Sequence, residues 1–266
     1  MLEEIVNKMK DSANKNVRSM QLHSIKEKTP KIQLIPFGDI HFGDKSANIV
    51  RAKETIDWVK NHPYARIILM GDLLNCATKT SVGAAVFDED FHGQTQYDLM
   101  GELLEPVKNK IYGSLIGNHE FRAFKNTGYN VTKMLAKQLG HKYYGFGSFI
   151  KLNVSGNNYI IYGTHGSSGA TLPYTKIKKL LDMSSYIDAD VYLMGHVHSL
   201  QVHTQKVKRV DLRKRIIENT KKYYVLTGHY LNYEDSYAEM KNMRPDKQGS
   251  PTIIFGGDKK EIRAIL

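Results

Sequence analysis

The stretch YLMGHVHS, residues 192–199, ends a strongly apolar run with a glycine and two histidines that are one residue apart. In an extended chain alternate side chains point the same way, so His196 and His198 would share one side while Val197 points to the other. Two imidazoles on one side of a strand end can converge on a metal ion. Taken alone, the stretch favours a simpler interpretation, in which one histidine is a buried hydrogen-bonded group and the other is solvated.

Four stretches further upstream end in the same way. They are IPFGDIHFGD (35–44), IILMGDLLN (67–75), SLIGNHEFR (114–122) and IIYGTHGSS (160–168). Each begins as an apolar, β-branched segment and breaks at a glycine into Asp, His or Asn. The repetition predicts five strands whose carboxyl ends deliver polar groups to one shared edge of the fold.

The polar side chains at these five strand ends form an oxygen and nitrogen ligand set. They are Asp39, His41, Asp72, Asn118, His119, His165, His196 and His198. Carboxylates and neutral imidazoles without a thiolate suit Mn²⁺, Fe or Zn²⁺. Two ions with four protein ligands each, one of them a shared carboxylate such as Asp72, need seven residues, which leaves one histidine over. A metal-free, pH-sensing histidine cluster would have no need for Asp39, Asp72 and Asn118.

The composition predicts one folded domain in a reducing compartment. The chain has 266 residues, of which 41% are hydrophobic and 24% charged, which are ordinary globular values. The single cysteine, Cys76, excludes an internal disulfide framework. No apolar run approaches the roughly 20 residues that cross a bilayer, and the acidic start MLEEIVNKMKD lacks the pattern of a signal peptide. We therefore expect a cytoplasmic protein without membrane contact.

The order of the predicted elements divides the chain at residue 30. Residues 1–30 are expected to form an N-terminal helical arm, because Leu2, Ile5, Val6 and Met9 fall at helical spacing. Strands then alternate with helices up to residue 139, and a hairpin, one helix at 174–186 and further strands follow. This order predicts an α/β fold in which residues 31–266 form two sheets packed face to face, with helices outside both.

The blocks GDIH, GDLLN, GNHE, GTHG and GHVH follow one another in this order between residues 38 and 198. They resemble the five signature motifs of the calcineurin-like metallophosphoesterase superfamily. Each block alone is weakly specific, whereas the complete ordered set is highly specific. The resemblance implies a double β-sandwich flanked by helices, the αββα metallophosphoesterase fold. It also implies two divalent metal ions, for which we expect Mn²⁺, with Fe or Zn²⁺ as alternatives.

Carried over residue by residue, the resemblance implies two ligand sets. One metal would be held by Asp39, His41, Asp72 and His198, and the second by Asp72, Asn118, His165 and His196. Asp72 is then the bridging ligand. His119 lies outside both sets and becomes the candidate general acid, because histidine titrates near neutral pH. The implied reaction is hydrolysis of a phosphoester by a metal-activated hydroxide.

Departures from the family pattern bear on the substrate. Protein phosphatases of this type carry GDxVDRG and RGNHE, whereas this chain has Asn75, Cys76 and Ile116 at the Asp, Arg and Arg positions of those motifs. A protein phosphatase is therefore disfavoured. Asn75 could still orient His119 through a hydrogen bond. Arg122, four residues after Asn118, could reach a substrate phosphate or could be an ordinary surface arginine.

The segment QKVKRVDLRKRIIENTKK, residues 205–222, is rich in basic residues and follows the last motif by a few positions. It predicts a nucleic-acid-binding surface beside the cleft, formed by Lys206, Lys208, Arg209, Arg213, Lys214 and Arg215. A solvated hairpin face is the alternative. The following tyrosines and His229 would add aromatic surfaces for a single-stranded or frayed nucleic acid. The net charge of +11 also favours a polyanionic partner.

We therefore expect a dinuclear phosphodiesterase, namely a nuclease whose catalytic domain resembles the SbcD-type exonucleases and which acts alone or as a small homo-oligomer. The alternative enzyme is a phosphomonoesterase for nucleotides or phosphoproteins. A third class, a nucleic-acid-binding module with a silent metal site, is disfavoured because every ligand and His119 are present. The polar insert at 78–96 is expected to border the substrate or to form an oligomer contact.

Overall fold

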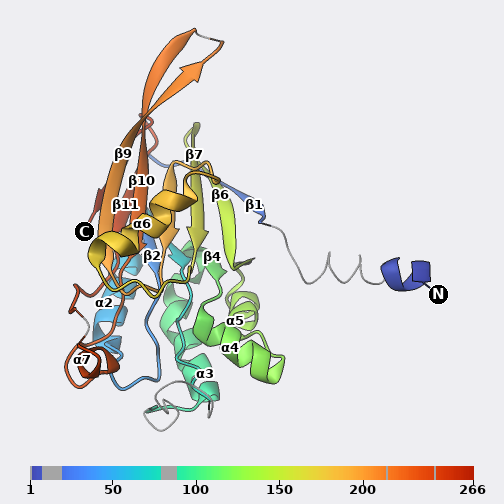
Figure 1. Cartoon of the computed structure of the whole chain (residues 1–266), viewed down its shortest axis with the longest axis vertical. Helices are drawn as coiled ribbons and strands as arrows, with labels where there is room; N and C mark the ends of the chain where they lie inside the picture. Colours follow the sequence, from blue (N-terminus) through green and yellow to red (C-terminus); the bar gives the residue numbers. More distant parts are fainter. Residues whose placement is uncertain (1, 8–19, 79–88, 214, 243) are drawn as a thin grey trace.

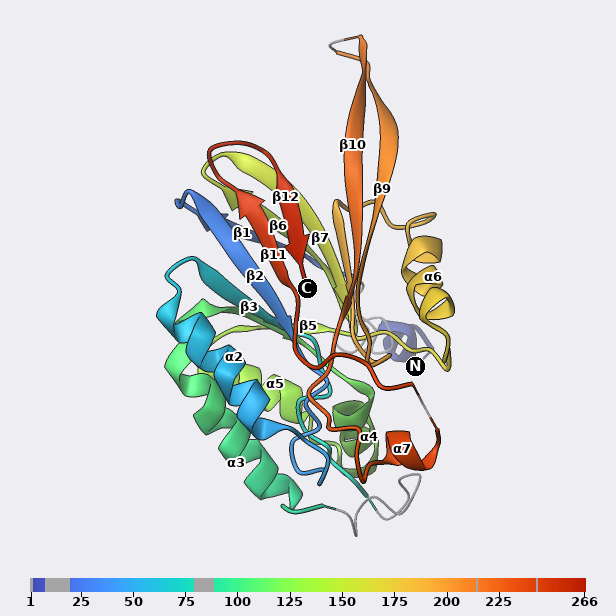
Figure 2. The same ribbon diagram turned by 90° about the vertical axis from the view of Figure 1, so that its left-hand side faces the viewer.

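Two six-stranded β-sheets lie face to face in the computed structural model, which describes residues 2–78, 89–213, 215–242 and 244–266 except for 8–19. Apolar side chains from both sheets fill the space between them, among them Leu34, Ile68, Leu152, Ile161 and Val225. Figures 1 and 2 show helices on the outer side of each sheet. The α/β double β-sandwich implied by the five motifs is therefore confirmed.

The first sheet carries the alternating strands and helices of the amino-terminal half. Its strand order is β12 (Ile262–Ile265), β11 (Thr252–Gly256), β2 (Lys31–Phe37), β3 (Ala65–Leu69), β4 (Ile111–Leu115) and β5 (Lys142–Gly145). Strands β2 to β5 are parallel, and β11 and β12 extend the sheet in antiparallel pairing. Parallel strands are covered on both faces, which explains why β2 and β3 are almost continuously apolar.

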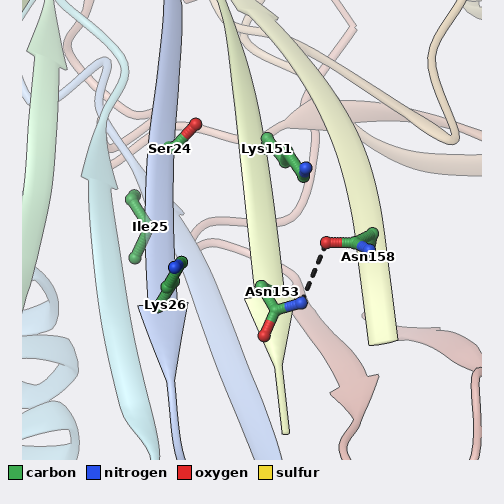
Figure 3. Close-up of a pocket in the computed structure, with 6 residues that line it drawn as sticks. All are labelled: Ser24, Ile25, Lys26, Lys151, Asn153 and Asn158. Carbon is green, nitrogen blue, oxygen red and sulfur yellow. Dashed lines mark hydrogen bonds between the residues drawn. The ribbon is translucent and has the colours of Figure 1, made fainter. Parts of the chain in front are cut away.

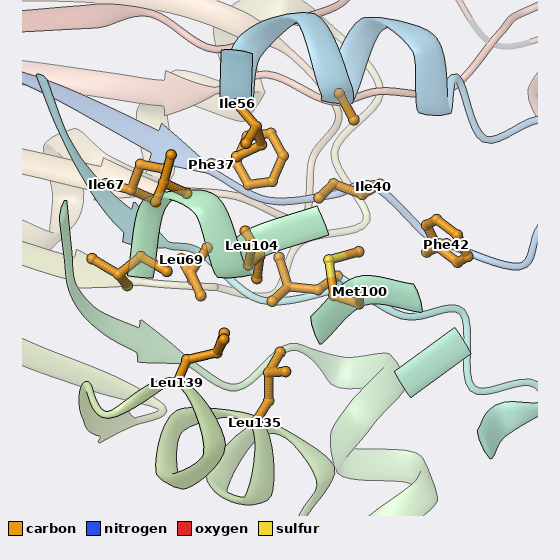
Figure 4. Packing of buried hydrophobic residues seen from close by; sticks show 14 of the residues in the cluster. Phe37, Ile40, Phe42, Ile56, Ile67, Leu69, Met100, Leu104, Leu135 and Leu139 are labelled. Atoms are coloured by element: carbon orange, nitrogen blue, oxygen red, sulfur yellow. The ribbon is translucent and has the colours of Figure 1, made fainter. Parts of the chain in front are cut away.

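Helices cover the outer face of this first sheet. They are α2 (Ile49–Asn61), α3 (Gly93–Leu104) with the 3₁₀ helix η2 (Glu105–Lys110), and α5 (Val131–Leu139). Figure 4 shows Phe37, Ile67 and Leu69 of the sheet packed against Ile56 and other helix residues. Trp58 of α2 is half-buried and packs at the edge of this core.

The second sheet has the order β1 (Leu22–Glu27), β6 (Gly147–Val154), β7 (Asn157–Thr164), β8 (Val191–Met194), β10 (Ile216–Thr227) and β9 (Leu200–Asp211). Helix α6 (Pro173–Met183) packs on its outer face through Ile177, Leu180 and Met183. The β9–β10 hairpin continues well beyond the other strands, as Figures 1 and 2 show. Because β9 runs from the metal-ligand end of the sheet outward, the hairpin tip lies at the opposite end.

The predicted helical arm at residues 1–30 is wrong in its second part. Residues 2–7 are helical, with Leu2 and Ile5 exposed, but Leu22–Glu27 form strand β1, which pairs in parallel with β6. Burial alternates along β1, so its period is that of a strand. The helical spacing of the first nine residues did not extend to this segment. Residues 8–19 lie outside the described residues.

Three further elements differ from the prediction. Helix α4 (Asn118–Thr127) begins directly at the third motif, where only a strand end was expected, and α7 (Tyr237–Met240) is a short turn of helix. The final strand β12 was also not predicted. None of the described helices combines the length and the apolar character needed to cross a bilayer.

Candidate metal centre

Five loops meet at one edge of the sandwich, where β2, β3, β4, β7 and β8 reach their carboxyl ends. Asp39 and His41 follow β2, Asp72 follows β3, and Asn118 and His119 open α4 after β4. His165 follows β7, and His196 and His198 follow β8. Parallel strands bring these loops together because their carboxyl ends lie at the same edge of each sheet. The structure therefore gathers all eight polar residues predicted from the five motifs.

Asp39, His41 and His198 form the first group of potential metal ligands, with one atom from each lying within 4.8 Å of the others. The Nε2 atoms of His41 and His198 are 3.0 Å apart, and His198 Nε2 is 3.4 Å from Asp39 Oδ1. Asp39 and His41 are buried, whereas His198 is partly open to solvent. One imidazole edge of this group therefore faces the solvent side.

Asp72, His165 and His196 form the second group, again with one atom each within 4.8 Å of the others. Asn118 belongs to the same place, because its Oδ1 lies 3.0 Å from His165 Nε2 and 2.6 Å from His196 Nδ1. Its oxygen is thus aimed at the same point as the two imidazoles. These four residues are the second ligand set that the resemblance implied.

Asp72 lies between the two groups. Its Oδ2 is 3.2 Å from His165 Nε2 in the second group and 3.8 Å from His41 Nε2 in the first. One carboxylate thus reaches imidazoles on both sides, which is the position a bridging ligand needs. His41, Asp72 and His119 form a third group of potential ligands, with one atom from each within 4.8 Å of the others, so His119 also faces the centre of the cluster.

The donor set of both groups fits borderline or hard divalent ions. Each group combines carboxylate or amide oxygens with imidazole nitrogens, as Mn²⁺, Fe and Zn²⁺ accept. Each also brings imidazole nitrogens within 3.4 Å of a carboxylate or amide oxygen at a largely buried position, where a cation could replace the ring protons. The residues present therefore fit two divalent ions.

The ligand loops are held in an unusual backbone conformation. Asp39, His41, Asp72, His196 and His198 all have positive φ, between 46° and 68°. Non-glycine residues rarely adopt this left-handed region, and its strain persists only where the surroundings fix the chain. We expected His196 and His198 to lie on one side of an extended strand. That expectation is wrong, because β8 ends at Met194 and both histidines lie in the loop that follows. Two successive left-handed bends send their rings to different ligand groups.

Two glycines allow the loops to approach one another closely. A Cβ atom at Gly117 would lie 2.1 Å from both the backbone nitrogen and Oδ1 of Asp72. A Cβ atom at Gly195 would lie 2.6 Å from Asp39 Oδ2. A side chain at either position would push a carboxylate out of the cluster, so these glycines are required for close approach.

Glu120 is a site residue that the sequence analysis missed. Its buried carboxylate accepts four backbone N–H groups, those of Asp72, Leu73, Leu74 and Gly117, at 2.7–3.1 Å. It thereby ties the Asp72 loop to the start of α4. Burial and the neighbouring Asp72 raise the pKa of Glu120 to about 7. The available signal was its place as the third residue of a helix, where Glu commonly bonds the backbone before the helix.

His119 is oriented by a backbone group. Its Nδ1 lies 2.7 Å from the carbonyl oxygen of Asn75, which also accepts a hydrogen bond from Arg122 Nη2 at 3.1 Å. The Asn75 side chain instead donates to Glu89. The predicted contact of Asn75 with His119 is therefore made by its main chain. Because Nδ1–H donates to this carbonyl, Nε2 is the nitrogen directed into the cluster.

The buried charges of the centre influence one another strongly. Burial lowers the pKa of His165, but Asp72 outweighs this effect and raises it to about 10. Burial raises the pKa of Asp72, yet His165, His119 and His41 bring it well below its usual range. Burial together with Arg122 lowers the pKa of His119 despite the opposing effect of Asp72. In the absence of metal, Asp72 and His165 thus form a buried ion pair.

His229 borders the first ligand group. Its ring lies against that of His198, with centroids 5.5 Å apart and planes 28° apart. Burial, and secondarily the proximity of His198, lower the pKa of His229 to about 4. The expectation that His229 lies beside the cleft is met, although it contacts a predicted metal ligand and does not form an open aromatic surface.

The basic segment lies elsewhere than we predicted. In β9, the rise of roughly 3.3 Å per residue places Lys206 about 20 Å and Asp211 about 36 Å beyond Leu200, on the side away from the ligand loops. The prediction that this segment borders the cleft is therefore wrong. The basic residues follow His198 closely in sequence, but they lie far from the site because strand β9 is extended and runs outward from it.

Within the hairpin, the predicted nucleic-acid-binding residues face different directions. Lys206 and Lys208 share the face of Val202, which packs against the core between the two sheets, whereas Arg209 lies on the opposite face and bonds Asp188 at 2.7 Å. Arg213 and Arg215 lie at the turn. Lys214 lies outside the described residues.

A shallow cavity on the second sheet lies apart from the ligand cluster. It has a volume of about 260 Å³ and is lined by residues of β1, β6 and β7, as Figure 3 shows. Asn153 and Asn158, at the end of these strands near the β6–β7 turn, bond each other across it. His165 lies at the other end of β7, so this cavity is separate from the ligand loops.

Comparison with known proteins gives structural similarities alone. No family model and no curated protein sequence matches the chain. A double mutant of Vps29 from Entamoeba histolytica has 13% identity and a TM-score of 0.42 over 88% of this chain and 98% of that chain. The zinc complex of wild-type Vps29 from that organism has 14% identity and a TM-score of 0.39, over 88% and 96%.

A conserved protein of Streptococcus pneumoniae, described as a predicted phosphoesterase, has 12% identity and a TM-score of 0.37 over 89% of this chain and 98% of that chain. These similarities concern overall architecture. The interpretation of the metal centre therefore depends on its own geometry.

Proposed function

We propose that the protein is a dinuclear metal-dependent phosphoesterase, and more specifically a phosphodiesterase that cleaves nucleic acid. The observation that carries the proposal is the position of Asp72, whose single buried carboxylate reaches imidazoles of two separate ligand groups. His119 adds a titratable group that faces the same centre without belonging to either predicted ligand set. A merely structural metal site would need neither a shared carboxylate nor this additional histidine.

The residues divide into holding and reacting groups. One ion would be held by Asp39, His41 and His198. The other would be held by Asn118, His165 and His196. Asp72 would bind both ions. Two such ions, for which we propose Mn²⁺, supply positive charge that polarises a phosphoester and lowers the pKa of a water molecule. Glu120 fixes the distance between the Asp72 loop and α4 through its backbone hydrogen bonds.

His119 is the proposed general acid. The Asn75 carbonyl holds the Nδ1 proton, so a second proton on Nε2 would be the one given to the leaving alkoxide. Arg122 donates a hydrogen bond of 3.1 Å to the same carbonyl, which fixes the group that orients the ring, and adds positive charge beside the centre. We therefore propose that Asn75 and Arg122 position His119.

The net charge of the protein and the distance from the metal centre to the hairpin lysines together support a nucleic-acid substrate. The net charge of +11 favours a polyanion. The hairpin lysines lie about 20 Å or more from Leu200, so a short substrate at the metal centre would not reach them. A duplex rises by roughly 34 Å per turn, and a duplex that enters the centre at one end would bring later phosphates to the hairpin. Lys206 and Lys208 are the described hairpin residues best placed for such contacts.

Substrate comparison in the presence of Mn²⁺ tests the proposal. Bis-aryl phosphate, mono-aryl phosphate, labelled DNA and labelled RNA are compared at equal enzyme concentration, with EDTA-treated protein as the control. We expect metal-dependent turnover with preference for diesters and nucleic acid. A wide preference for the monoester would contradict the phosphodiesterase proposal and favour the phosphomonoesterase. Absence of metal-dependent turnover on all four substrates would favour a silent metal site.

A further inference from the structure

Three phenylalanines, two of them exposed and Phe121 half-buried, form a cluster next to the metal centre. Phe121 and Phe124 belong to α4, and Phe146 lies in the turn between β5 and β6. The rings of Phe121 and Phe146 meet edge to face with centroids 4.8 Å apart, and those of Phe121 and Phe124 are stacked at 6.1 Å. Phe146 is 60% exposed and Phe124 38% exposed. We call these three residues the phenylalanine platform.

The platform is outside the hydrophobic cores that stabilise the fold. None of its three members occurs in the buried clusters between the sheets or under the helices, as far as the described residues define them. Contiguous exposed apolar surface on a protein is a sign of an interaction site, because side chains left in water do not contribute hydrophobic burial to the stability of the fold. The platform is therefore a candidate binding surface.

Both parts of the platform are attached to metal-ligand loops. Phe121 is one helical turn after Asn118, about 4.5 Å along the axis, and its N–H donates to Gly117 O. The carbonyl of Phe146 accepts a hydrogen bond of 2.9 Å from Thr164 Oγ1, and Thr164 directly precedes His165. The platform is thus continuous with the second ligand group, which Asn118 and His165 share.

Positive charge accompanies the rings. On α4, the spacing of 118, 121, 122 and 125 places these residues on one face. Arg122 follows Phe121 and bonds the Asn75 carbonyl beside His119, and Lys125 Nζ lies 4.7 Å from the Phe121 ring centroid. A ligand at this face therefore meets a metal-ligand amide, aromatic rings and two cations within about two helical turns.

We propose that the phenylalanine platform stacks a nucleobase of the substrate next to the phosphate held at the metal centre. Phe146 offers the exposed ring, Phe121 supports it edge-on, and Arg122 and Lys125 attract the flanking phosphates. Aromatic rings beside cations are the combination by which proteins bind unpaired nucleotides without sequence preference. This inference rests on the proposed function and deepens its substrate class: the nucleic acid would present an unpaired nucleotide at the end that enters the metal centre.

A binding experiment with and without bases tests this role. The probes are a phosphorothioate-linked oligothymidylate and an abasic oligomer of the same length and charge, measured by fluorescence anisotropy with metal-loaded protein. We expect wild type to bind the base-bearing oligomer about tenfold more tightly. Phe146→Ala should abolish this preference and Phe146→Trp should retain it. Tyr186→Ala, which removes an exposed aromatic residue after α6, is the matched control and should retain the preference.

Three results would overturn the inference. The first is equal binding of the base-bearing and abasic oligomers by wild type. The second is an unchanged preference for the base-bearing oligomer in Phe146→Ala. The third is a change of oligomeric state in Phe146→Ala, measured by light scattering, which would make the platform a contact between copies of the chain. Competition with thymidine monophosphate separates the two sources of a base: displacement at equal concentration indicates a nucleotide site, and displacement by the oligomer alone indicates a nucleic-acid site. Both outcomes support base stacking.

The proposed function can fail separately. If Mn²⁺-dependent turnover of a bis-aryl phosphate occurs but base-bearing and abasic oligomers bind equally, the stacking role alone is overturned. If base preference is found without turnover of any ester, the platform is supported and the phosphoesterase proposal is overturned.

Discussion

The ligand loops and the β9–β10 hairpin are both rich in polar residues, but the fold treats them in opposite ways. At the loops, five residues with positive φ and the Glu120 carboxylate bring side chains from five distant segments within a few ångströms. In the hairpin, basic residues that are neighbours in sequence point to two faces and to the turn. Residues far apart in the chain thus form one site, whereas adjacent ones are dispersed.

The contrast teaches which kind of sequence signal locates a site. Glycine followed by a polar residue at the end of a buried strand places that residue at a defined edge, because strand direction and sheet order fix where the strand ends. A run of charge fixes no direction, because an extended strand moves about 3.3 Å per residue and alternates its sides. The predictions below test whether the two regions also differ in function.

The largest effect is expected at the bridging carboxylate. Asp72→Asn should reduce binding at both metal positions and decrease turnover by more than about 10⁴-fold, beyond the 10²- to 10⁴-fold of a lost general acid, because both ligand groups depend on this side chain. Elemental analysis of the dialysed, metal-loaded variant measures the stoichiometry. Asp98→Asn on the exposed surface of α3 is the control and should keep both ions. Retention of two equivalents by Asp72→Asn would separate this residue from the centre.

The second effect concerns His119. His119→Ala should retain both ions and lose roughly 10²- to 10⁴-fold in the turnover of a natural ester, whose alkoxide must be protonated. A p-nitrophenyl ester should show a much smaller defect, because its leaving group needs no proton. Since burial lowers the pKa of His119, the wild-type rate on the natural ester should lose its general-acid contribution as pH rises through a value below 6.5.

Two measurements decide the role of His119. The ratio of natural to p-nitrophenyl turnover, followed against pH in wild type and variant, should depend on pH in wild type alone. Loss of one metal equivalent in His119→Ala would instead make this histidine a ligand.

The third effect tests the clamp that Glu120 makes. Glu120→Gln replaces one carboxylate oxygen by an NH₂ group, so two of the four backbone N–H groups lose their acceptor. We expect unfolding to become easier by about 1–3 kcal/mol and metal affinity to fall about 10- to 100-fold. Denaturant unfolding and metal titration measure the two quantities. Glu102→Gln on α3 is the control, and equal behaviour of the two variants would contradict the clamp.

The fourth effect is a pH dependence of metal binding. Asp72 raises the pKa of His165 to about 10, so the metal-free protein carries a proton at this ring near neutral pH. A metal must displace that proton, and apparent affinity should therefore rise about tenfold per pH unit over the range below 10. Calorimetry in buffers of different ionisation enthalpy should detect one released proton. An affinity independent of pH would show that His165 is already neutral.

The smallest effect is expected from the hairpin. Lys221 lies opposite Lys206 in the hairpin register. Replacing Lys206, Lys208 and Lys221 by Ser should reduce affinity for a long duplex and decrease the salt slope by nearly one log-log unit per lost phosphate contact. The control is a variant in which Lys53 of α2 and Lys133 and Lys137 of α5 are replaced by Ser, which removes the same charge elsewhere on the surface. Duplexes much shorter than one turn should not respond. An effect of equal size on a dinucleotide would place the hairpin at the metal centre.

Sequence was most informative where chemistry and topology coincide. The five strand ends predicted which polar residues the fold gathers at one edge, because glycine, carboxylate and imidazole residues there have few other reasons to recur. The alternation argument for His196 and His198 was wrong, since left-handed backbone angles are not visible in residue types. Glu120 and Phe146 were missed because their roles depend on neighbours from distant segments. Strand β1 was missed because its weak alternation follows a helical pattern.

The central claim is that one carboxylate joins two metal positions. Anomalous diffraction from crystals of the wild-type protein grown with Mn²⁺ tests it most directly. We predict two anomalous peaks about 3.5–4 Å apart, both within coordination distance of Asp72, with His119 outside the coordination of either ion. A single peak, or two peaks that do not share Asp72, would contradict the account.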